Sequence, residues 1–177
     1  KLRDLPFPST AMVNGFCMGG GLELALACTY RVAREDPQTR FAFPEVMLGI
    51  WPFWHGLQWL PKLVGPAAGL DMILTGRAVD ARRAKKMGLA TETAPLRVLE
   101  NTARAVTLEA RPPRKLRLLE RLMLGIGRSF VAAQARKQVA RRVRREHYPA
   151  PYAILQAWVK YDGDPFIAPD DPVTSIK

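Results

Sequence analysis

The sequence predicts an α/β fold followed by a helical C-terminal extension, and three observations lead to this prediction. The apolar stretch Ser9–Phe16 precedes three glycines, and good helix formers follow them, which is the order strand, turn and helix. Further strand-like and helix-like stretches alternate as far as residue 110. Beyond "RPPR" at residues 111–114, the apolar residues recur with helical spacing only.

Two more strands are expected after the first. Asn14 and Gly15 form a strong turn signal at the end of the first strand, and Tyr30–Ala33 is apolar enough for the next one. Residues 41–46 alternate between apolar and other side chains, which suggests a further extended piece that Pro44 breaks into a loop.

Capping residues mark the helices of the first part. Pro66 and Gly76 bracket one helix, and Asp80 as N-cap with Gly88 as stop brackets the next. A third helix is expected in "PLRVLENTARAVTLEA". Its apolar face is formed by Leu96, Leu99, Ala103 and Val106.

The C-terminal part predicts three more helices and a tail. The helices are expected in "LRLLERLMLGIG", "RSFVAAQARKQVARRVRRE" and "YPAPYAILQAWVKY". The prolines after Asp162 are typical of a poorly ordered end or linker. We therefore expect an α/β domain over residues 1–110, a basic helical extension over 111–161 and a tail over 162–177.

Composition limits the class of protein. With 177 residues, 48% of them hydrophobic, the chain suits one domain or part of a larger one. Cys17 and Cys28 lie in apolar surroundings without a CxxC pair, which favours core thiols and a reduced, cytoplasmic setting. Glu23 inside the apolar stretch argues against a membrane span. Because the chain begins at Lys1 without a signal-peptide pattern, we expect a missing N-terminal segment.

The net charge of +11 is concentrated in one segment. Residues 111–147 contain twelve Lys and Arg against two Glu. A solvated charged helix is one interpretation, and a surface that attracts CoA phosphates or an anionic membrane is another. Nucleic acid is a third, but Tyr148, Tyr152 and Trp158 follow the basic run instead of alternating with it.

The three glycines are the first candidate for chemistry. The glycines do not match a dinucleotide-binding fingerprint, because Leu24 stands where Gly or Ala is needed. They do not match a phosphate-binding loop either, because no lysine follows them. Unpaired N–H groups at a helix start can instead stabilise an oxyanion, and Glu23 one turn later could act as a base or position a water. A surface or salt-bridged glutamate is the alternative interpretation of Glu23.

The second candidate is Glu45 in "FPEVMLGI". Apolar neighbours raise the pKa of a carboxyl group, which suits proton exchange near neutral pH. Two carboxylates beside one oxyanion site would allow water to add across a polarised double bond. His55 has no catalytic partner in the sequence and is expected to pack or lie at the surface, and His147 is expected at a helix end.

Three motifs together resemble one family. "AMVNGFCMGGGLELALAC", "FPEVMLGIWP" and "LTGRAVDARRAKKMGLA" look like the enoyl-CoA hydratase (crotonase) superfamily, whose members bind acyl-CoA thioesters. "QARKQVARRVRREHYPAPYAILQAW" resembles the segment after the hydratase domain in the multifunctional alpha-subunit family of bacterial fatty-acid oxidation complexes. The resemblance implies the later part of the crotonase ββα spiral fold. In the alpha-subunit family an NAD-dependent 3-hydroxyacyl-CoA dehydrogenase follows, and the sequence contains nothing like its dinucleotide-binding fingerprint.

The resemblance also implies roles for residues. Gly20 would be the backbone donor to the thioester oxygen, and Glu23 and Glu45 would hold the attacking water and exchange a proton at the α carbon. Having both carboxylates favours a hydratase, a lyase of fatty-acid β-oxidation, over the related isomerases. Substrate contacts are implied for Gly19, Gly21, Pro52 and Gly56, with no metal or redox cofactor and with CoA as part of the substrate.

Two departures leave other functions open. The second oxyanion donor of the family comes from an upstream segment that is not in this sequence, and Phe53, Trp54 and His55 are bulky where acyl room is expected. The alternatives are a non-catalytic crotonase-like remnant or assembly module, and a basic module for nucleic acid or anionic membranes. Expected partners are an acyl-CoA and a second copy of the chain, or a thiolase subunit in an oxidation complex.

Overall fold

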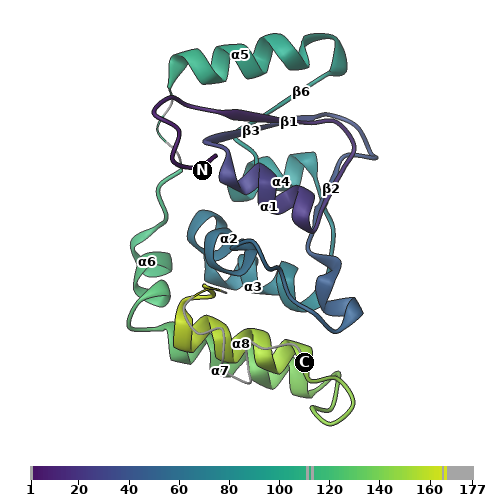
Figure 1. Cartoon of the computed structure of the whole chain (residues 1–177), viewed down its shortest axis with the longest axis vertical. Coiled ribbons are helices and arrows are strands. Elements are labelled where there is room, and N and C mark those ends of the chain that lie inside the picture. Colours follow the sequence, from purple (N-terminus) through teal and green to yellow (C-terminus); the bar gives the residue numbers. More distant parts are fainter. Residues whose placement is uncertain (1, 111, 113, 165, 167–177) are drawn as a thin grey trace. The chain divides into compact units, whose positions relative to one another are not determined.

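The computed structural model describes residues 2–110, 112, 114–164 and 166 (Figure 1). The chain divides into two compact units, each built from two separate stretches of sequence. The first unit comprises residues 1–42 and 78–115, and the second comprises 43–77 and 116–177. Each unit is described by itself.

The first unit contains two small sheets. In one sheet, β1 (Thr10–Val13), β3 (Tyr30–Arg34) and β6 (Glu92–Ala94) are parallel, with β3 in the middle. In the other, β2 (Phe16–Met18) pairs in parallel with β4 (Arg40–Ala42) and β4 pairs antiparallel with β5 (Val79–Asp80). Parallel neighbours need crossover connections, and α1 and α4 provide them within this unit.

Three helices cover the sheet of β1, β3 and β6. Helix α5 (Leu99–Glu109) lies on one face, and α1 (Gly20–Ala27) and α4 (Ala81–Met87) lie on the other (Figure 1). A short 3₁₀ helix, η2 (Leu96–Val98), precedes α5. The core beneath α5 is apolar and consists of Tyr30, Val32, Ala94, Leu99, Ala103 and Val106. Burial of this face is the main stabilisation of the layer.

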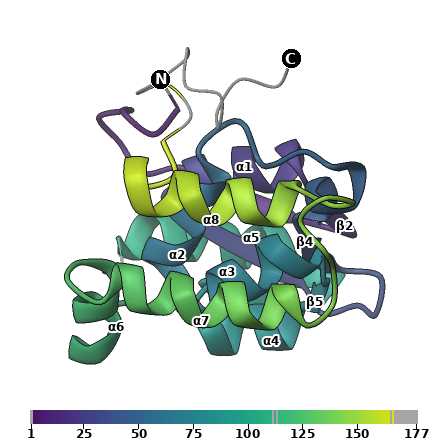
Figure 2. The same cartoon turned by 90° about the horizontal axis from the view of Figure 1, so that it is seen from below.

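The second unit is helical. It contains the 3₁₀ helix η1 (Pro44–Leu48), α2 (Gly56–Val64), α3 (Pro66–Thr75), α6 (Leu118–Leu124), α7 (Arg128–Ala140) and α8 (Ala150–Tyr161). Helices α7 and α8 run side by side (Figure 2), and α3 packs against both α2 and α7. Helix α2 approaches α3 closely at Gly69, where an added Cβ would lie 2.8 Å from the Pro61 Cα.

Most predicted elements are confirmed by the structure. The capping predictions hold at Pro66, Gly76 and Gly88, and the Asp80 side chain accepts a hydrogen bond from the Arg83 N–H at 2.8 Å. The helices expected after "RPPR" are present, and no regular element covers the described residues 112 and 114–117. The division into three domains stays a prediction, and its tail lies mostly outside the described residues.

The turn predicted at Asn14 and Gly15 is confirmed, because β1 ends at Val13 and Gly15 adopts a φ of 114° before β2 begins in the other sheet. One helix was missed and two local predictions are wrong. Helix α2 was not expected, since Pro61 lies inside it. Leu96 lies exposed before α5 instead of on its buried face. Helix α7 ends at Ala140. If the helix continued, the arginines between 141 and 145 would lie three or four residues apart on its surface, and like charges at that spacing are unfavourable.

Candidate active site

The glycine run forms the turn between β2 and α1. Gly19 adopts φ 55° and ψ −130°, a conformation that residues with a Cβ avoid. Its N–H donates to the Ala42 carbonyl at 3.0 Å, which fixes the turn to β4. The glycine at this position therefore lets the chain reverse directly from a strand into a helix.

Within the part of the chain that the structure describes, the start of α1 presents two open donors. The Gly19 carbonyl accepts the first helical hydrogen bonds, from Leu22 N–H at 2.8 Å and Glu23 N–H at 3.0 Å. The N–H groups of Gly20 and Gly21 precede these bonds, and both glycines are exposed. An added Cβ on Gly21 would meet no atom within 4 Å, so another molecule has room to approach. This arrangement favours a negatively charged oxygen.

Glu23 follows these donors in the first turn of α1. The residue is 4% exposed. A carboxylate near a helix N-terminus is stabilised by the helix dipole. The surface interpretation of Glu23 is therefore wrong, because the residue is buried.

Arg31 is a residue that the sequence analysis did not single out. The residue is 4% exposed, and its guanidinium donates from Nε to the Leu89 carbonyl at 2.7 Å and from Nη1 to the Cys28 carbonyl at 2.8 Å. A longer bond of 3.3 Å reaches the Ala25 carbonyl near the end of α1. Burial lowers the pKa of Arg31 to about 10, so the group is charged at neutral pH. This cation holds the C-terminal end of the helix that carries Glu23.

Glu45 belongs to the second unit. It is the second residue of η1, which turns back at Gly49, where φ is 77°. Within the described residues its buried Oε2 has no hydrogen-bond partner. Burial raises the pKa of Glu45, and a backbone hydrogen bond partly opposes this rise. Both features are those of a carboxyl group suited to exchange a proton with another molecule.

The segment after Glu45 differs from the expected small turn. Pro52 and Gly56 are buried, and Gly56 begins α2. Phe53 is 41% exposed and Trp54 is 64% exposed, so neither side chain fills the core of its own unit. His55 has a φ of 72° and stacks on Trp59 with ring centroids 4.8 Å apart, which confirms its predicted packing role.

The remaining candidates have structural positions. Cys17 is buried, and burial raises the pKa of its thiol to about 11, as suits a core residue. His147 lies exposed in turns after Ala140, so its predicted place at a helix end is wrong. Among the described residues, no group of three His, Cys, Asp or Glu could hold a metal ion. No helix in the described ranges has the length and apolar character of a membrane span.

The predicted site residues therefore fall into two groups. Gly19, Gly20, Gly21 and Glu23 are brought together at the start of α1 in the first unit. Glu45, Pro52 and Gly56 lie on η1, α2 and their connection in the second unit. The roles of all seven residues stay predictions.

Known proteins resemble this chain over most of its length. An alpha subunit of the fatty acid oxidation complex from Vibrio cholerae serotype O1 is 45% identical over 163 residues, which covers 88% of this chain and 23% of that protein. An alpha subunit from Shewanella loihica is 45% identical over 159 residues, which covers 87% of this chain and 22% of that protein. This chain thus spans about a quarter of the length of these curated relatives.

Solved structures are similar as well. An enoyl-CoA hydratase from Bacillus anthracis aligns with a TM-score of 0.58 at 31% identity, covering 90% of this chain and 62% of that one. A monofunctional enoyl-CoA isomerase from M. smegmatis aligns with a TM-score of 0.55 at 34% identity, covering 64% of this chain and 52% of that one. These likenesses confirm the predicted crotonase-like α/β fold. The profile of the enoyl-CoA hydratase/isomerase family matches residues 1–142, and the chain therefore belongs to that family.

Proposed function

We propose that this chain hydrates a trans-2-enoyl-CoA to a 3-hydroxyacyl-CoA in fatty-acid β-oxidation. The observation that carries the proposal is the start of α1, where two open N–H groups stand next to a buried glutamate. Its family includes both hydratases and isomerases, and its relatives are named as subunits of a fatty acid oxidation complex. By extension, we propose that the chain acts within such a complex on acyl-CoA thioesters.

The glycine donors would polarise the thioester. The Gly20 N–H donates to the thioester oxygen, which gains negative charge as water adds to the conjugated double bond. Since the donors are fixed by the turn at Gly19, they need no rearrangement as this charge develops. Losing one such donor typically costs a factor of about 10²–10³ in rate.

The two glutamates would manage the water and its protons. Glu23 and Glu45 together hold the water, whose oxygen bonds to the β carbon. A proton passes to the α carbon from Glu45, and Glu45 recovers a proton from the water. The raised pKa of Glu45 supports this role, because a group that exchanges protons works best when its pKa approaches the working pH.

Loss of the conjugated thioester absorbance tests the proposal. The 177-residue chain is incubated with a short trans-2-enoyl-CoA, alongside Glu23→Gln, Glu45→Gln and the matched control Glu100→Gln. Glu100 is exposed and pairs with Arg104 at 2.8 Å, so its loss should leave turnover unchanged. Each active-site change is expected to lower turnover about 10²-fold or more. A folded chain without turnover would favour the non-catalytic remnant.

An isomerase is the second candidate, because the buried Glu45 Oε2 has no hydrogen-bond partner among the described residues, as a one-carboxylate proton shuttle needs. The assay separates the two reactions. With a 3-enoyl-CoA as substrate, an isomerase retains activity in Glu23→Gln and loses it in Glu45→Gln. A hydratase loses activity on the 2-enoyl substrate in both variants.

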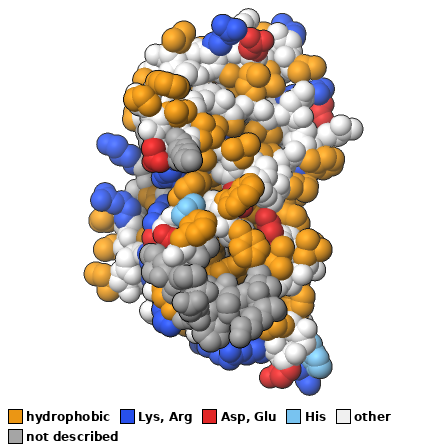
Figure 3. All heavy atoms as spheres, viewed as in Figure 1, with side chains coloured by type: hydrophobic (Ala, Val, Ile, Leu, Met, Phe, Trp, Pro, Cys, Tyr) orange, Lys and Arg blue, Asp and Glu red, His pale blue; other side chains and the backbone are white. Residues whose placement is uncertain are grey.

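A basic binding module has less support. On the face that Figure 3 shows, the visible blue Lys and Arg side chains stand in separate groups among hydrophobic side chains. Nucleic-acid binding surfaces usually gather their cations along the path of the phosphates. Steep salt-dependent binding to DNA or anionic vesicles, without affinity for acyl-CoA, would be the result that favours this function.

A further inference from the structure

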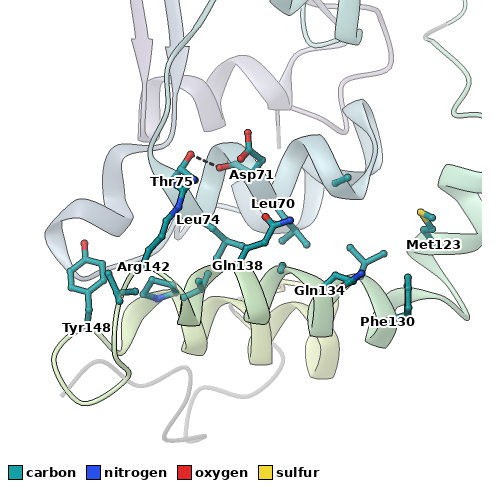
Figure 4. Close-up of a pocket in the computed structure, with 16 residues that line it drawn as sticks. Leu70, Asp71, Leu74, Thr75, Met123, Phe130, Gln134, Gln138, Arg142 and Tyr148 are labelled. Atoms are coloured by element: carbon teal, nitrogen blue, oxygen red, sulfur yellow. Dashed lines mark hydrogen bonds between the residues drawn. The ribbon is translucent and has the colours of Figure 1, made fainter.

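A groove of about 450 Å³ lies between α3 and α7 in the second unit. Its size falls within the range of about 300–1,000 Å³ that small-molecule sites occupy. It uses none of the seven predicted site residues. Figure 4 shows side chains from both helices pointing toward one another across it, with Leu70 and Leu74 on the α3 side.

The two ends of the groove differ in chemistry. Met123 and Phe130 close one end, and Phe130 is 65% exposed although it is large and apolar. Arg142 and Tyr148 stand at the other end (Figure 4). From Phe130 to the end of α7 at Ala140, a helical rise of about 1.5 Å per residue gives a length of roughly 15 Å. The groove is therefore long and mostly apolar, with Gln134 and Gln138 along its α7 side and the cation of Arg142 at one end.

The polar end presents one available cation. Within the described residues, the Arg142 guanidinium takes part in no ion pair, and it is exposed. The nearby Asp71 carboxylate is already paired with Arg77 at 2.5 Å, so it does not neutralise Arg142. The Tyr148 hydroxyl donates to the Val46 carbonyl, which holds the tyrosine ring at this end. A single anionic group is the complement that Arg142 lacks.

We propose that this groove binds a fatty acid, with its carboxylate at Arg142 and its aliphatic chain along α7 toward Phe130. A linear aliphatic chain suits a long, mostly apolar groove, and one carboxylate matches one cation. The proposal is independent of the proposed hydratase reaction, since it involves neither Gly20 nor either catalytic glutamate.

Displacement of a fluorescent fatty acid tests the proposal. Dodecanoate is expected to displace the probe, and hexanoate and methyl dodecanoate are expected to bind at least tenfold more weakly, because one lacks chain length and the other lacks charge. Arg142→Gln should weaken dodecanoate binding about tenfold. The matched control is Arg141→Gln, which removes an equal charge from an exposed neighbour that does not line the groove.

A second variant and a second measurement locate the ligand. Ala135→Trp fills the groove and should abolish binding, with circular dichroism confirming that the variant folds. In the unmodified chain, a photoreactive fatty acid should label α3 and α7. The proposal would be overturned if Arg141→Gln and Arg142→Gln lost dodecanoate affinity equally. It would also be overturned if folded Ala135→Trp bound dodecanoate as well as the unmodified chain, or if the photoreactive fatty acid labelled residues outside α3 and α7. Glu23→Gln should bind dodecanoate normally, so failure of the hydratase proposal would leave this result unaffected.

Discussion

Replacing Arg31 by methionine removes a buried guanidinium while keeping most of the aliphatic side chain. In the intact chain this group joins the end of α1 to the turn between α4 and β6, through Cys28 and Leu89. The carbonyl groups of both residues lose a donor in the variant. We expect a clear loss of stability, and we expect it to come from the first unit.

The size of the loss follows from the hydrogen bonds that the charged group donates. Such bonds contribute about 1.5–3 kcal/mol each after desolvation is included, so the two short bonds at 2.7 and 2.8 Å together contribute about 3–6 kcal/mol. The loss should therefore be about 3–6 kcal/mol, a large share of the roughly 5–15 kcal/mol that stabilises a typical domain.

Urea unfolding followed by far-ultraviolet circular dichroism measures this difference. Arg34→Met is the matched control, because Arg34 lies on the same strand and its side chain is 32% exposed in its ion pair with Asp36. Such a pair contributes about 0–1 kcal/mol. If Arg31→Met loses no more unfolding free energy than Arg34→Met, the assignment of Arg31 as the tie on α1 is refuted.

Three further changes have defined outcomes. Burial raises the pKa of Glu45 above its ordinary 4.5, so the folded chain holds the carboxyl proton more tightly than the unfolded chain does. The unfolding free energy should therefore fall as the pH rises from 4.5 through the raised pKa. Glu45→Gln should remove that fall in a pH series of urea titrations, and an unchanged pH dependence would contradict it. Gly69→Ala places a Cβ 2.8 Å from the Pro61 backbone and should cost about 1–3 kcal/mol by the same unfolding assay; a neutral result would show that α2 can shift away. Asp80→Ala removes the N-cap of α4 and should cost about 1 kcal/mol, whereas Asp80→Asn should retain most of the stability.

Local signals predicted the parts of the fold that depend on neighbouring residues. Helices α3 and α4 end where glycines adopt a positive φ, at Gly76 and Gly88, and such caps are visible in the sequence. The position of Glu23 at a helix start was predictable in the same way. Its burial was not, because the surroundings of α1 depend on strands that come from distant parts of the chain.

Features that depend on distant contacts were missed. Arg31 reads as an ordinary strand residue, and its partners become apparent only when Leu89 comes next to it from 58 residues away. Strand β2 is three residues long and is specified by pairing with β4, not by its own pattern. Helix α2 forms despite Pro61, since its buried face packs on α3.

The interleaving of the two units has a consequence for how the chain is made. Residues 43–77 leave the ribosome before β5, α4, β6 and α5, which the first unit still needs. The pairing of β3 with β6 must therefore wait for about 60 more residues to be synthesised and for that long loop to close. Until then the outer edge of β3 is an open strand edge, which favours aggregation. A recombinant fragment that stops before residue 92 would retain that edge permanently.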